Sequence, residues 1–151
     1  MSGGKGGGVF YGEAIGCLIK GNSAAYGGAA YDVALRNCTI VDNAFTQRGS
    51  AAYGSVHNCI VVDNDGPGDG GVSDTSPTYS CLDPFVSGTG NVAAPAGFVD
   101  AANGNYRLLT NSPCINAGEA RDWMNDAVDL DGDSRVQGNG VDMGAYEREV
   151  Q

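Results

Sequence analysis

Carboxylate side chains supply most of the chemistry that this sequence offers. Along residues 129–135, DLDGDSR, they stand at alternate positions: Asp129, Asp131 and Asp133. A loop with this spacing can direct several hard oxygens at one Ca²⁺ ion. Calcium is therefore a candidate ligand of this segment.

The same segment also has a purely structural interpretation. It is not an EF-hand loop, because its glycine comes fourth instead of sixth and Gly140 occupies the twelfth position, where a bidentate glutamate is expected. In the structural alternative the segment is a turn, and Arg135 pairs with Asp142 or Glu147 to hold the last strand. We favour the turn.

A second acidic cluster surrounds a loop rich in glycine, proline and serine, residues 65–77. Its carboxylates are Asp63, Asp65, Asp69 and Asp74. Neighbouring glycines would let backbone carbonyls join the first three carboxylates around calcium or a sugar. The favoured alternative is an exposed loop whose charge keeps the surface soluble.

Catalytic groups other than carboxylates are few. His57 is the only histidine, and its repeat partners Ile15 and Arg36 place it on an outward column, so we interpret it as a surface residue. A polysaccharide lyase needs calcium or a basic group beside the uronate, and an arginine or lysine as base. The basic residues on the repeats after Lys5 are Lys20, Arg36 and Arg48. Nothing in the sequence shows that they converge.

Asp42 and Asp63 offer a hydrolase-like alternative, because they are 21 residues apart, which is one repeat. On neighbouring coils, two carboxylates about 5 Å apart can share a proton or a cation. Each of the two is followed directly by an asparagine of the repeat, at an expected turn. A solvated pair at a turn is the simpler interpretation.

Charge and composition exclude several classes of protein. The formal net charge is −10, from 18 acidic against 8 basic residues, so nucleic acids and anionic membranes are not expected partners. No run of about 18 apolar residues is present, so no membrane span is expected. The start, MSGGKGGGVFYG, lacks the apolar stretch of a signal peptide. The 25 glycines indicate many tight turns and argue against long helices.

A repeat organises the first half of the chain. NCTIVDN, residues 37–43, returns almost unchanged as NCIVVDN, residues 58–64. Cysteines lie at intervals of 21, 21 and 22 residues: Cys17, Cys38, Cys59 and Cys81. An asparagine follows each of the first three at a constant distance: Asn22, Asn43 and Asn64. A tyrosine column also aligns: Tyr11, Tyr31 and Tyr53.

A period of about 21 residues indicates a solenoid. A leucine-rich repeat would need an LxxLxL pattern and a helical segment, whereas these units are rich in Gly, Asn, Thr, Val and Ile. At about 3.3 Å per residue, one unit makes about three short strands around a narrow core, with coils about 4.8 Å apart. We therefore predict an all-β single domain, residues 1–151. A parallel β-helix solenoid of about four 21-residue coils would span residues 8–81, and an irregular C-terminal cap residues 82–151.

The columns of the repeat are predicted to be structural. Cys38 and Ile40 would face the core while Thr39 and Val41 face outward, because strand side chains alternate. Cysteine is small and apolar enough to stack in a narrow core, so the first three cysteines form one ladder. The three asparagines form a second ladder at a turn, where identical amides hydrogen-bond between coils. A metal or catalytic site built from these two columns is the less favoured alternative.

The second half of the chain carries a run of short motifs over residues 79–147: YSC, GTGN, FVD, NYRLL, SPCINAG, DLDGDSR and VDMGAYE. In this order they resemble the C-terminal end of bacterial right-handed parallel β-helix proteins, the pectate-lyase-like group described as choice-of-anchor Q type. The upstream rungs, YGGAAYDVALRNCTIVDN, are similar to the repeats of that group. The resemblance implies a right-handed solenoid in a large extracellular protein, secreted or attached to the cell surface, with carbohydrate-linked roles.

The resemblance also bears on two cysteines. Cys81 and Cys114 lie in the family-like motifs YSC and SPC, which implies a disulfide between the cap and the last coil, as suits an oxidising compartment. In the alternative, Cys81 is a fourth rung of the cysteine column and Cys114 is a buried thiol. Trp123, the only tryptophan, would stack on a sugar ring or, as we favour, cover apolar core in the cap.

Two functions fit these observations. The first is a non-catalytic structural or adhesive β-helix module that binds carbohydrate. The second is a fragment of a lyase or hydrolase acting on acidic polysaccharide, and the scarcity of basic residues on the repeats argues against it. Because the chain begins within a repeat, we also expect a homo-oligomer that forms through the uncapped N-terminal coil.

Overall fold

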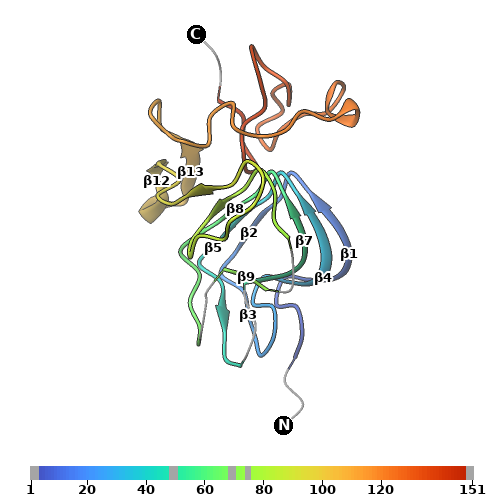
Figure 1. The fold of residues 1–151 in the computed structure, drawn as a ribbon. Helices are drawn as coiled ribbons and strands as arrows, with labels where there is room; N and C mark the ends of the chain where they lie inside the picture. Colours follow the sequence, from blue (N-terminus) through green and yellow to red (C-terminus); the bar gives the residue numbers. More distant parts are fainter. Residues whose placement is uncertain (1–3, 48–50, 68–70, 74–75, 149–151) are drawn as a thin grey trace.

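The computed structural model describes residues 4–47, 51–67, 71–73 and 76–148, and within them the chain winds into a parallel β-solenoid of about three turns (Figure 1). The first turn holds β1 (Val9–Ile15), β2 (Leu18–Lys20) and β3 (Ser23–Ala24). The second holds β4 (Ala30–Arg36), β5 (Thr39–Val41) and β6 (Ala44–Phe45). The third holds β7 (Ala52–His57) and β8 (Ile60–Val61).

The chain then extends the stack and adds a non-repeating region. The extending strands are β9 (Val72–Ser73), β10 (Cys81–Leu82) and β11 (Val92–Ala93). The hairpin β12 (Phe98–Asp100) and β13 (Asn105–Leu108) encloses the 3₁₀ turn η1 (Ala101–Asn103), and a second 3₁₀ turn, η2 (Asp122–Met124), follows. No helix in the described part of the chain has the length and apolar character needed to cross a membrane.

Residues one repeat apart pair directly, as the period predicts. In the sheet β1-β4-β7-β9, Arg36 lies opposite Ile15 on one side and His57 on the other. In the sheet β11-β10-β8-β5-β2, Ile40 lies between Ile19 and Val61. β3 pairs with β6 on the third side. All of these pairings are parallel, so the predicted parallel β-helix is confirmed.

Two corners of each coil require a left-handed backbone, and the repeat supplies residues that tolerate it. Asn37 and Asn58, with φ of 47° and 54°, turn the chain before β5 and β8. Asp42 and Asp63, with φ of 55° and 54°, turn it after them. Asn and Asp adopt this conformation more readily than other residues with a side chain. In the first coil glycine takes both places. The repeated NC and DN pairs therefore mark corners.

The interior of the solenoid is filled by small apolar side chains, among them Leu35, Cys38 and Ile40, all fully buried. Thr39 and Val41, which were predicted to face outward, are buried as well. Their side chains do point away from the interior, but they meet a second apolar cluster, in which Val41 joins Ile60, Met143 and Tyr106. The outer face of this sheet is therefore a second core.

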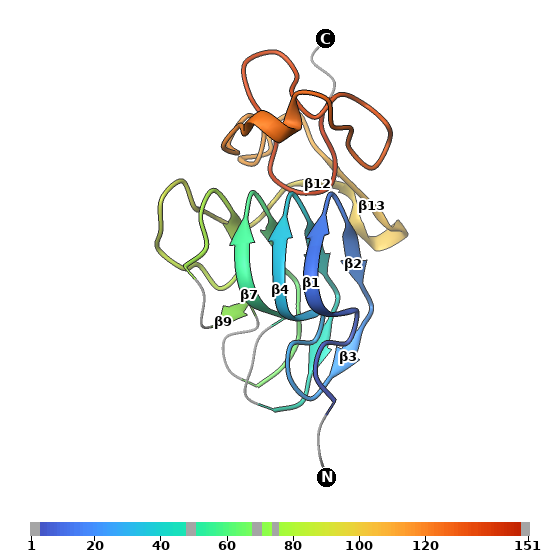
Figure 2. The same ribbon diagram turned by 90° about the vertical axis from the view of Figure 1, so that its right-hand side faces the viewer.

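The C-terminal region, residues 82–148, supplies the other half of that second core. It packs mainly along the side of the coils, beyond the arrowheads of β1, β4 and β7 (Figures 1 and 2). One residue of this region, Val86, packs instead against the interior of the solenoid. Most of the region predicted to cap the last coil thus covers one flank of several coils, because the apolar positions on the outer face of β5 and β8 need a partner.

Candidate functional site

β1, β4 and β7 lie side by side in one sheet (Figure 2), and the register of their pairing places side chains in columns on its outer surface, here called the open face. At one end the rings of Tyr31 and Tyr53 stack with centroids 4.7 Å apart and planes inclined by 9°. Phe10 continues the column with its centroid 6.0 Å from that of Tyr31. Because Tyr31 lies between the other two rings, its faces are covered. We interpret this column as a structural ladder.

The other end of the open face holds a pocket of about 330 Å³, here called the arginine pocket. Its lining combines the coils with the C-terminal region: Arg36, Ser55, His57, Arg121 and Trp123. Figure 2 shows η2, which carries Trp123, above the ends of β4 and β7. The neighbouring Met124 is fully buried and fixes this turn. Trp123, predicted to cover apolar core, instead keeps 37% of its surface exposed at the pocket.

Each guanidinium group of the arginine pocket has a carboxylate partner. Arg36 Nη1 lies 2.9 Å from Glu13 Oε1. Arg121 forms an ion pair with Glu119, whose Oε2 is also 3.6 Å from His57 Nε2. A guanidinium group has more N–H donors than one carboxylate uses, so both arginines keep donors for a ligand. The pairs hold the two groups in place without blocking them.

His57 is more enclosed than the surface residue that the sequence suggested. Its side chain is 17% exposed, and Nδ1 lies 2.9 Å from Thr78 Oγ1. Burial, together with the positive charge of Arg121, lowers the pKa of His57 below its usual value. The imidazole is therefore neutral near pH 7, and its Nε2 forms no hydrogen bond with another described residue.

A second pocket, of about 610 Å³, lies between the corner after β8, the strands β10 and β11, and the hairpin β12–β13. We call it the acidic pocket. Its lining is apolar except for two carboxylates: Val62, Asp63, Leu82, Asp83, Phe85 and Phe98, with the segment 93–97. Asp63 is exposed, and its partial desolvation, together with the charges of Asp42 and Asp83, raises its pKa. Three carboxylates thus lie near one another.

Among the described residues, Asp42 has a side-chain hydrogen-bond partner, whereas Asp63 and Asp83 have none. Its Oδ2 accepts a hydrogen bond of 2.5 Å from the Tyr106 hydroxyl. Burial and this bond raise the pKa of Tyr106 to about 12, so the hydroxyl stays protonated. Asp42 and Asp63 do stack on neighbouring coils, with Asp42 N donating to Asp63 O. Asp42 holds the hairpin, while Asp63 faces the pocket.

Comparison with known proteins adds no assignment. No protein-family model, no curated protein and no solved structure gives a significant match to this chain. The parallel β-solenoid therefore rests on the structure, and the pectate-lyase-like family stays an expectation from sequence motifs.

The other acidic residues singled out in the sequence contribute less to a site. Asp65 is exposed and its backbone pairs with that of Ala44. Asp69 and Asp74 lie outside the described residues. Among those described, no group of three or more His, Cys, Asp or Glu side chains is arranged to hold a metal ion. Of the two described carboxylates in this cluster, Asp63 lines the acidic pocket.

The segment DLDGDSR forms a turn organised by its own first carboxylate. Asp129 Oδ1 accepts hydrogen bonds of 2.9 Å from the N–H groups of Asp131 and Asp133, and Oδ2 accepts one of 2.7 Å from Glu147 N. Asp131 forms an ion pair with Arg107. These contacts occupy two of the three carboxylates with protein partners. The segment therefore has the contacts of the structural turn, and calcium binding by it stays a prediction.

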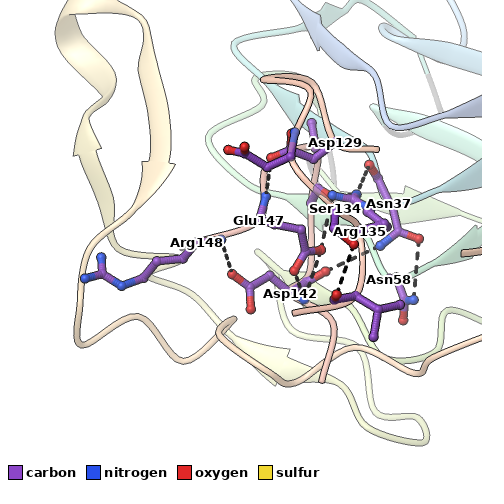
Figure 3. Close-up of polar contacts among 12 residues, drawn as sticks. Asn37, Asn58, Asp129, Ser134, Arg135, Asp142, Glu147 and Arg148 are labelled. Carbon is purple, nitrogen blue, oxygen red and sulfur yellow. Dashed lines mark hydrogen bonds and ion pairs between the residues drawn. The ribbon is translucent and has the colours of Figure 1, made fainter. Parts of the chain in front are cut away.

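Arg135 joins the last segment to the solenoid (Figure 3). It is 1% exposed, its Nη1 lies 3.2 Å from Glu147 Oε1, and its Nη2 donates to the carbonyl oxygens of Asn37 and Gly144. Burial raises the pKa of Glu147, while the positive charge of Arg135 and the hydrogen bonds that Glu147 accepts from Asp142 N oppose that rise. The pairing with Glu147 that the sequence suggested is thus present, in a buried network.

Two asparagines that sequence reasoning passed over anchor the C-terminal region. Asn58 Nδ2 donates to Glu119 O at 2.9 Å, and Glu119 N donates to Asn58 Oδ1 at 2.8 Å. Asn37 Nδ2 donates to Asp142 O at 3.4 Å. Gly144, with φ of 94°, donates its N–H to Asn58 O, and a Cβ there would lie 2.7 Å from Thr39 Oγ1. The available signal was the asparagine directly before Cys38 and Cys59.

The asparagines after the cysteines form the hydrogen-bonded ladder described by the period. Asn22 Nδ2 donates to Asn43 Oδ1, and Asn43 Nδ2 donates to Asn64 Oδ1, both at 3.0 Å. The left-handed residue at this corner is the preceding Gly or Asp, not the asparagine. Cys17, Cys38 and Cys59 are free thiols on successive coils. These two columns are occupied with holding coils together.

Cys81 does not continue the cysteine column, because the last interval is one residue longer. Cys81 lies opposite Ile60, while Ser80 Oγ accepts a hydrogen bond of 3.0 Å from Cys59 N. Ser80 is therefore the fourth rung, and Cys81 faces outward toward Cys114. Both thiols are fully buried and free. A hydrogen bond with Cys114, together with burial, raises the pKa of Cys81. The disulfide stays a prediction.

Proposed function

We propose that the protein is a non-catalytic, carbohydrate-binding β-solenoid module of a secreted or surface-attached bacterial protein, and that its arginine pocket holds an acidic sugar. The observation that supports this is a convergence. Arg36 on a coil and Arg121 in the C-terminal region line one pocket together with Trp123. The bacterial and extracellular setting rests on the resemblance of the motifs.

The chemistry of these side chains suits a sugar that carries a carboxylate. A guanidinium group binds a carboxylate through parallel N–H donors, and its planar fork favours this geometry. An indole ring supplies an apolar surface for the C–H face of a sugar ring. In a chain with a net charge of −10, a pocket that gathers two of the 8 basic residues is a favourable place for an anion.

The competing function is a lyase or hydrolase that acts on the same class of polysaccharide. Both arginines of the pocket are ion-paired, which leaves neither as an obvious base. His57 is held between Thr78 and Glu119. The contacts favour binding over catalysis, so product formation is the outcome that separates the two functions.

The single tryptophan makes the test direct, because its fluorescence reports on this pocket. We expect a uronate oligosaccharide to change the emission of Trp123. A neutral oligosaccharide of the same length should bind more weakly by roughly tenfold or more. Arg36→Ala should weaken the uronate by roughly tenfold, and Arg36→Lys by less. Arg107→Ala is the control, since it removes the same charge beside Asp131.

Two outcomes would contradict this proposal. Equal affinity for the uronate and the neutral oligosaccharide would remove the role of the arginines. Unsaturated product absorbance, or new reducing ends, released from a uronate polymer would favour the enzyme. Loss of that product in Arg36→Ala would then assign the chemistry to the arginine pocket.

We also propose that copies of the chain associate through the edge formed by β1, β2 and β3. In the described residues each of these strands stands at an end of its sheet, and unpaired strand edges readily pair. Phe10, Tyr11 and Ile15 are 52%, 65% and 42% exposed there. Light scattering at micromolar concentration should show a homo-oligomer, and Ile15→Lys should shift it toward the monomer. A monomeric unmodified chain would contradict the association.

A further inference from the structure

The packing of the fold does not require the two carboxylates that line the acidic pocket. Apart from Asp63 and Asp83, the described side chains that line it are apolar; both carboxylates are exposed, and Phe85 is 53% exposed beside them. Neither carboxylate side chain forms a hydrogen bond or ion pair with another described residue. An ionised carboxylate only accepts hydrogen bonds, so a ligand for this pocket must bring donors.

A backbone reason exists for Asp63 but not for Asp83. Asp63 occupies a left-handed corner with φ of 54°, where aspartate is one of the tolerated residues. Asp83 has an ordinary φ and uses its backbone N–H, which donates to Val61 O at 3.0 Å. Its side chain nevertheless adds a negative charge beside Asp63, at a cost in repulsion. A positively charged ligand would reverse that cost.

Anions and metal ions fit this lining poorly. No lysine or arginine of the described residues lines the pocket, so an acidic sugar would meet like charge from Asp63 and Asp83. Calcium takes about six to eight oxygen ligands, whereas most of this wall is alanine, leucine, valine, proline and phenylalanine. A ligand with one positive group, further donors and an apolar surface is the better match.

We propose that the acidic pocket binds an amino sugar with a protonated amine, held by Asp83 and Asp63, with the C–H face of its ring against Phe85. The ammonium group donates to one carboxylate and a hydroxyl of the ring donates to the other. The exposed phenylalanine adds an apolar contact and, through its ring face, an attraction for the cation. This site is separate from the arginine pocket and does not depend on the function proposed for it.

A glucosamine oligosaccharide with free amines is the probe, and amide NMR of the isotope-labelled full chain is the readout. Near neutral pH with the amines protonated, the amide signals of Asp63, Asp83 and Phe85 should shift, while those of Trp123 and Arg36 should not. The N-acetylated oligosaccharide of the same length keeps the ring and loses the charge. We expect it to bind at least tenfold more weakly, roughly.

Matched variants test which carboxylate binds the amine of the ligand. Asp83→Asn keeps the shape and should weaken the amine ligand roughly tenfold or more, whereas Asp65→Asn removes an equal charge outside the pocket and should change little. Phe85→Ala should weaken binding several-fold and tests the apolar contact without touching the charge. Thermal denaturation of each variant shows that it is folded before affinities are compared.

Four results would overturn this proposal. The N-acetylated probe could bind as tightly as the free amine, or Asp65→Asn could weaken binding as much as Asp83→Asn, which would indicate non-specific attraction. Ca²⁺ alone could produce the same shifts and displace the oligosaccharide, which would make the pocket a metal site. An absence of shifts at the acidic pocket would also overturn it, and would leave the uronate titration of Trp123 unaffected.

Discussion

The arginine pocket and the acidic pocket differ in charge yet have the same kind of position. One gathers Arg36 and Arg121 beside the only tryptophan, and the other gathers Asp63 and Asp83 beside an exposed phenylalanine. Each is lined partly by coils and partly by the C-terminal region. Neither lies on repeated residues alone. The repeat supplies a regular wall, and the chemistry appears where a non-repeating segment meets it.

This comparison explains why the two carboxylate-rich motifs of the sequence behave differently. In DLDGDSR the carboxylate of Asp129 accepts hydrogen bonds from backbone N–H groups, and that of Asp131 forms an ion pair with Arg107. In the acidic pocket the carboxylates of Asp63 and Asp83 face apolar residues. Spacing in the sequence made the first motif look like the better ligand set. The number of partners already satisfied within the protein decides which carboxylates remain for a ligand.

The largest effect should come from Arg135, because its buried guanidinium group joins the last segment of the C-terminal region to the coils. Arg135→Ala leaves Glu147 buried without its cation, and we expect a loss of about 3–5 kcal/mol in the free energy of unfolding. Urea denaturation measures the loss. Ligand titrations should then show weaker binding at both pockets. Arg107→Ala is the control: it breaks an exposed pair and should cost less than about 1 kcal/mol.

A double variant makes the expectation about Arg135 sharper. Arg135→Met combined with Glu147→Leu removes both charges, so its free energy of unfolding should be higher than that of Arg135→Ala alone. Undiminished binding at both pockets in a folded Arg135→Ala protein would break the comparison, because it would show that the pockets do not need this junction.

Oxidation of Cys81 and Cys114 should produce the next largest effect. Closing a loop of a few tens of residues lowers the entropy of the unfolded chain and should add about 3–4 kcal/mol to the free energy of unfolding. Denaturation with and without a reductant gives the difference, and Cys114→Ser should abolish it. Since Cys81 and Asp83 both follow Ser80 closely, the disulfide should tighten the acidic pocket and leave the arginine pocket unchanged. A full thiol count after oxidation would disprove the pairing.

Asn58 should separate the two pockets. Asn58→Gly keeps the left-handed corner but removes the amide that holds both backbone groups of Glu119, at an expected cost of about 2 kcal/mol. Glu119 pairs with Arg121 and faces His57, so uronate binding at the arginine pocket should weaken. Binding at the acidic pocket should stay the same. Equal weakening at both would show that Asn58 acts on general stability instead of on one site.

The smallest effect should be a dependence of binding on pH, with opposite sign at the two pockets. The pKa of His57 lies below its usual value, so acidification through that pKa adds a positive charge to the arginine pocket and should strengthen uronate binding. The pKa of Asp63 lies above its usual value, so further acidification removes a negative charge and should weaken amine binding. Titrations at a series of pH values should diverge by a few-fold. His57→Gln and Asp63→Asn should flatten the respective profiles.

The fold was predictable because a solenoid repeats its constraints in the sequence. The 21-residue interval gives the pairing of Arg36 with His57, and the asparagine column gives the amide ladder. The corner residues were also legible, although the left-handed positions are Asn37 and Asp42 rather than Asn43. Each coil must pair with the next at a spacing of about 4.8 Å, so an error in the predicted strands of one coil conflicts with the neighbouring coils.

The candidate sites were less predictable, since they depend on contacts between segments with no common period. Nothing in the sequence aligns Arg121 with Arg36, and the one-residue lengthening before Cys81 turned that side chain to the other face of the sheet. The alternation of strand side chains places Thr39 on the outer face of the sheet, but it does not tell whether another segment covers that face. It became buried only because residues from the other half of the chain pack on it.

The C-terminal region is attached to the solenoid at a few corners, which affects how the chain can change in length. Arg135 and Asn58 attach it through the corners of the second and third coils, at Asn37 and Asn58 themselves. The first coil meets the second by strand pairing and by side-chain contacts between matching positions, such as the amides of Asn22 and Asn43, and a further copy of the repeat could reproduce both. Duplication of a unit on that side would lengthen the solenoid by about 4.8 Å per copy and leave both pockets intact. Growth by gene duplication and conservation of binding chemistry are therefore physically compatible in this architecture.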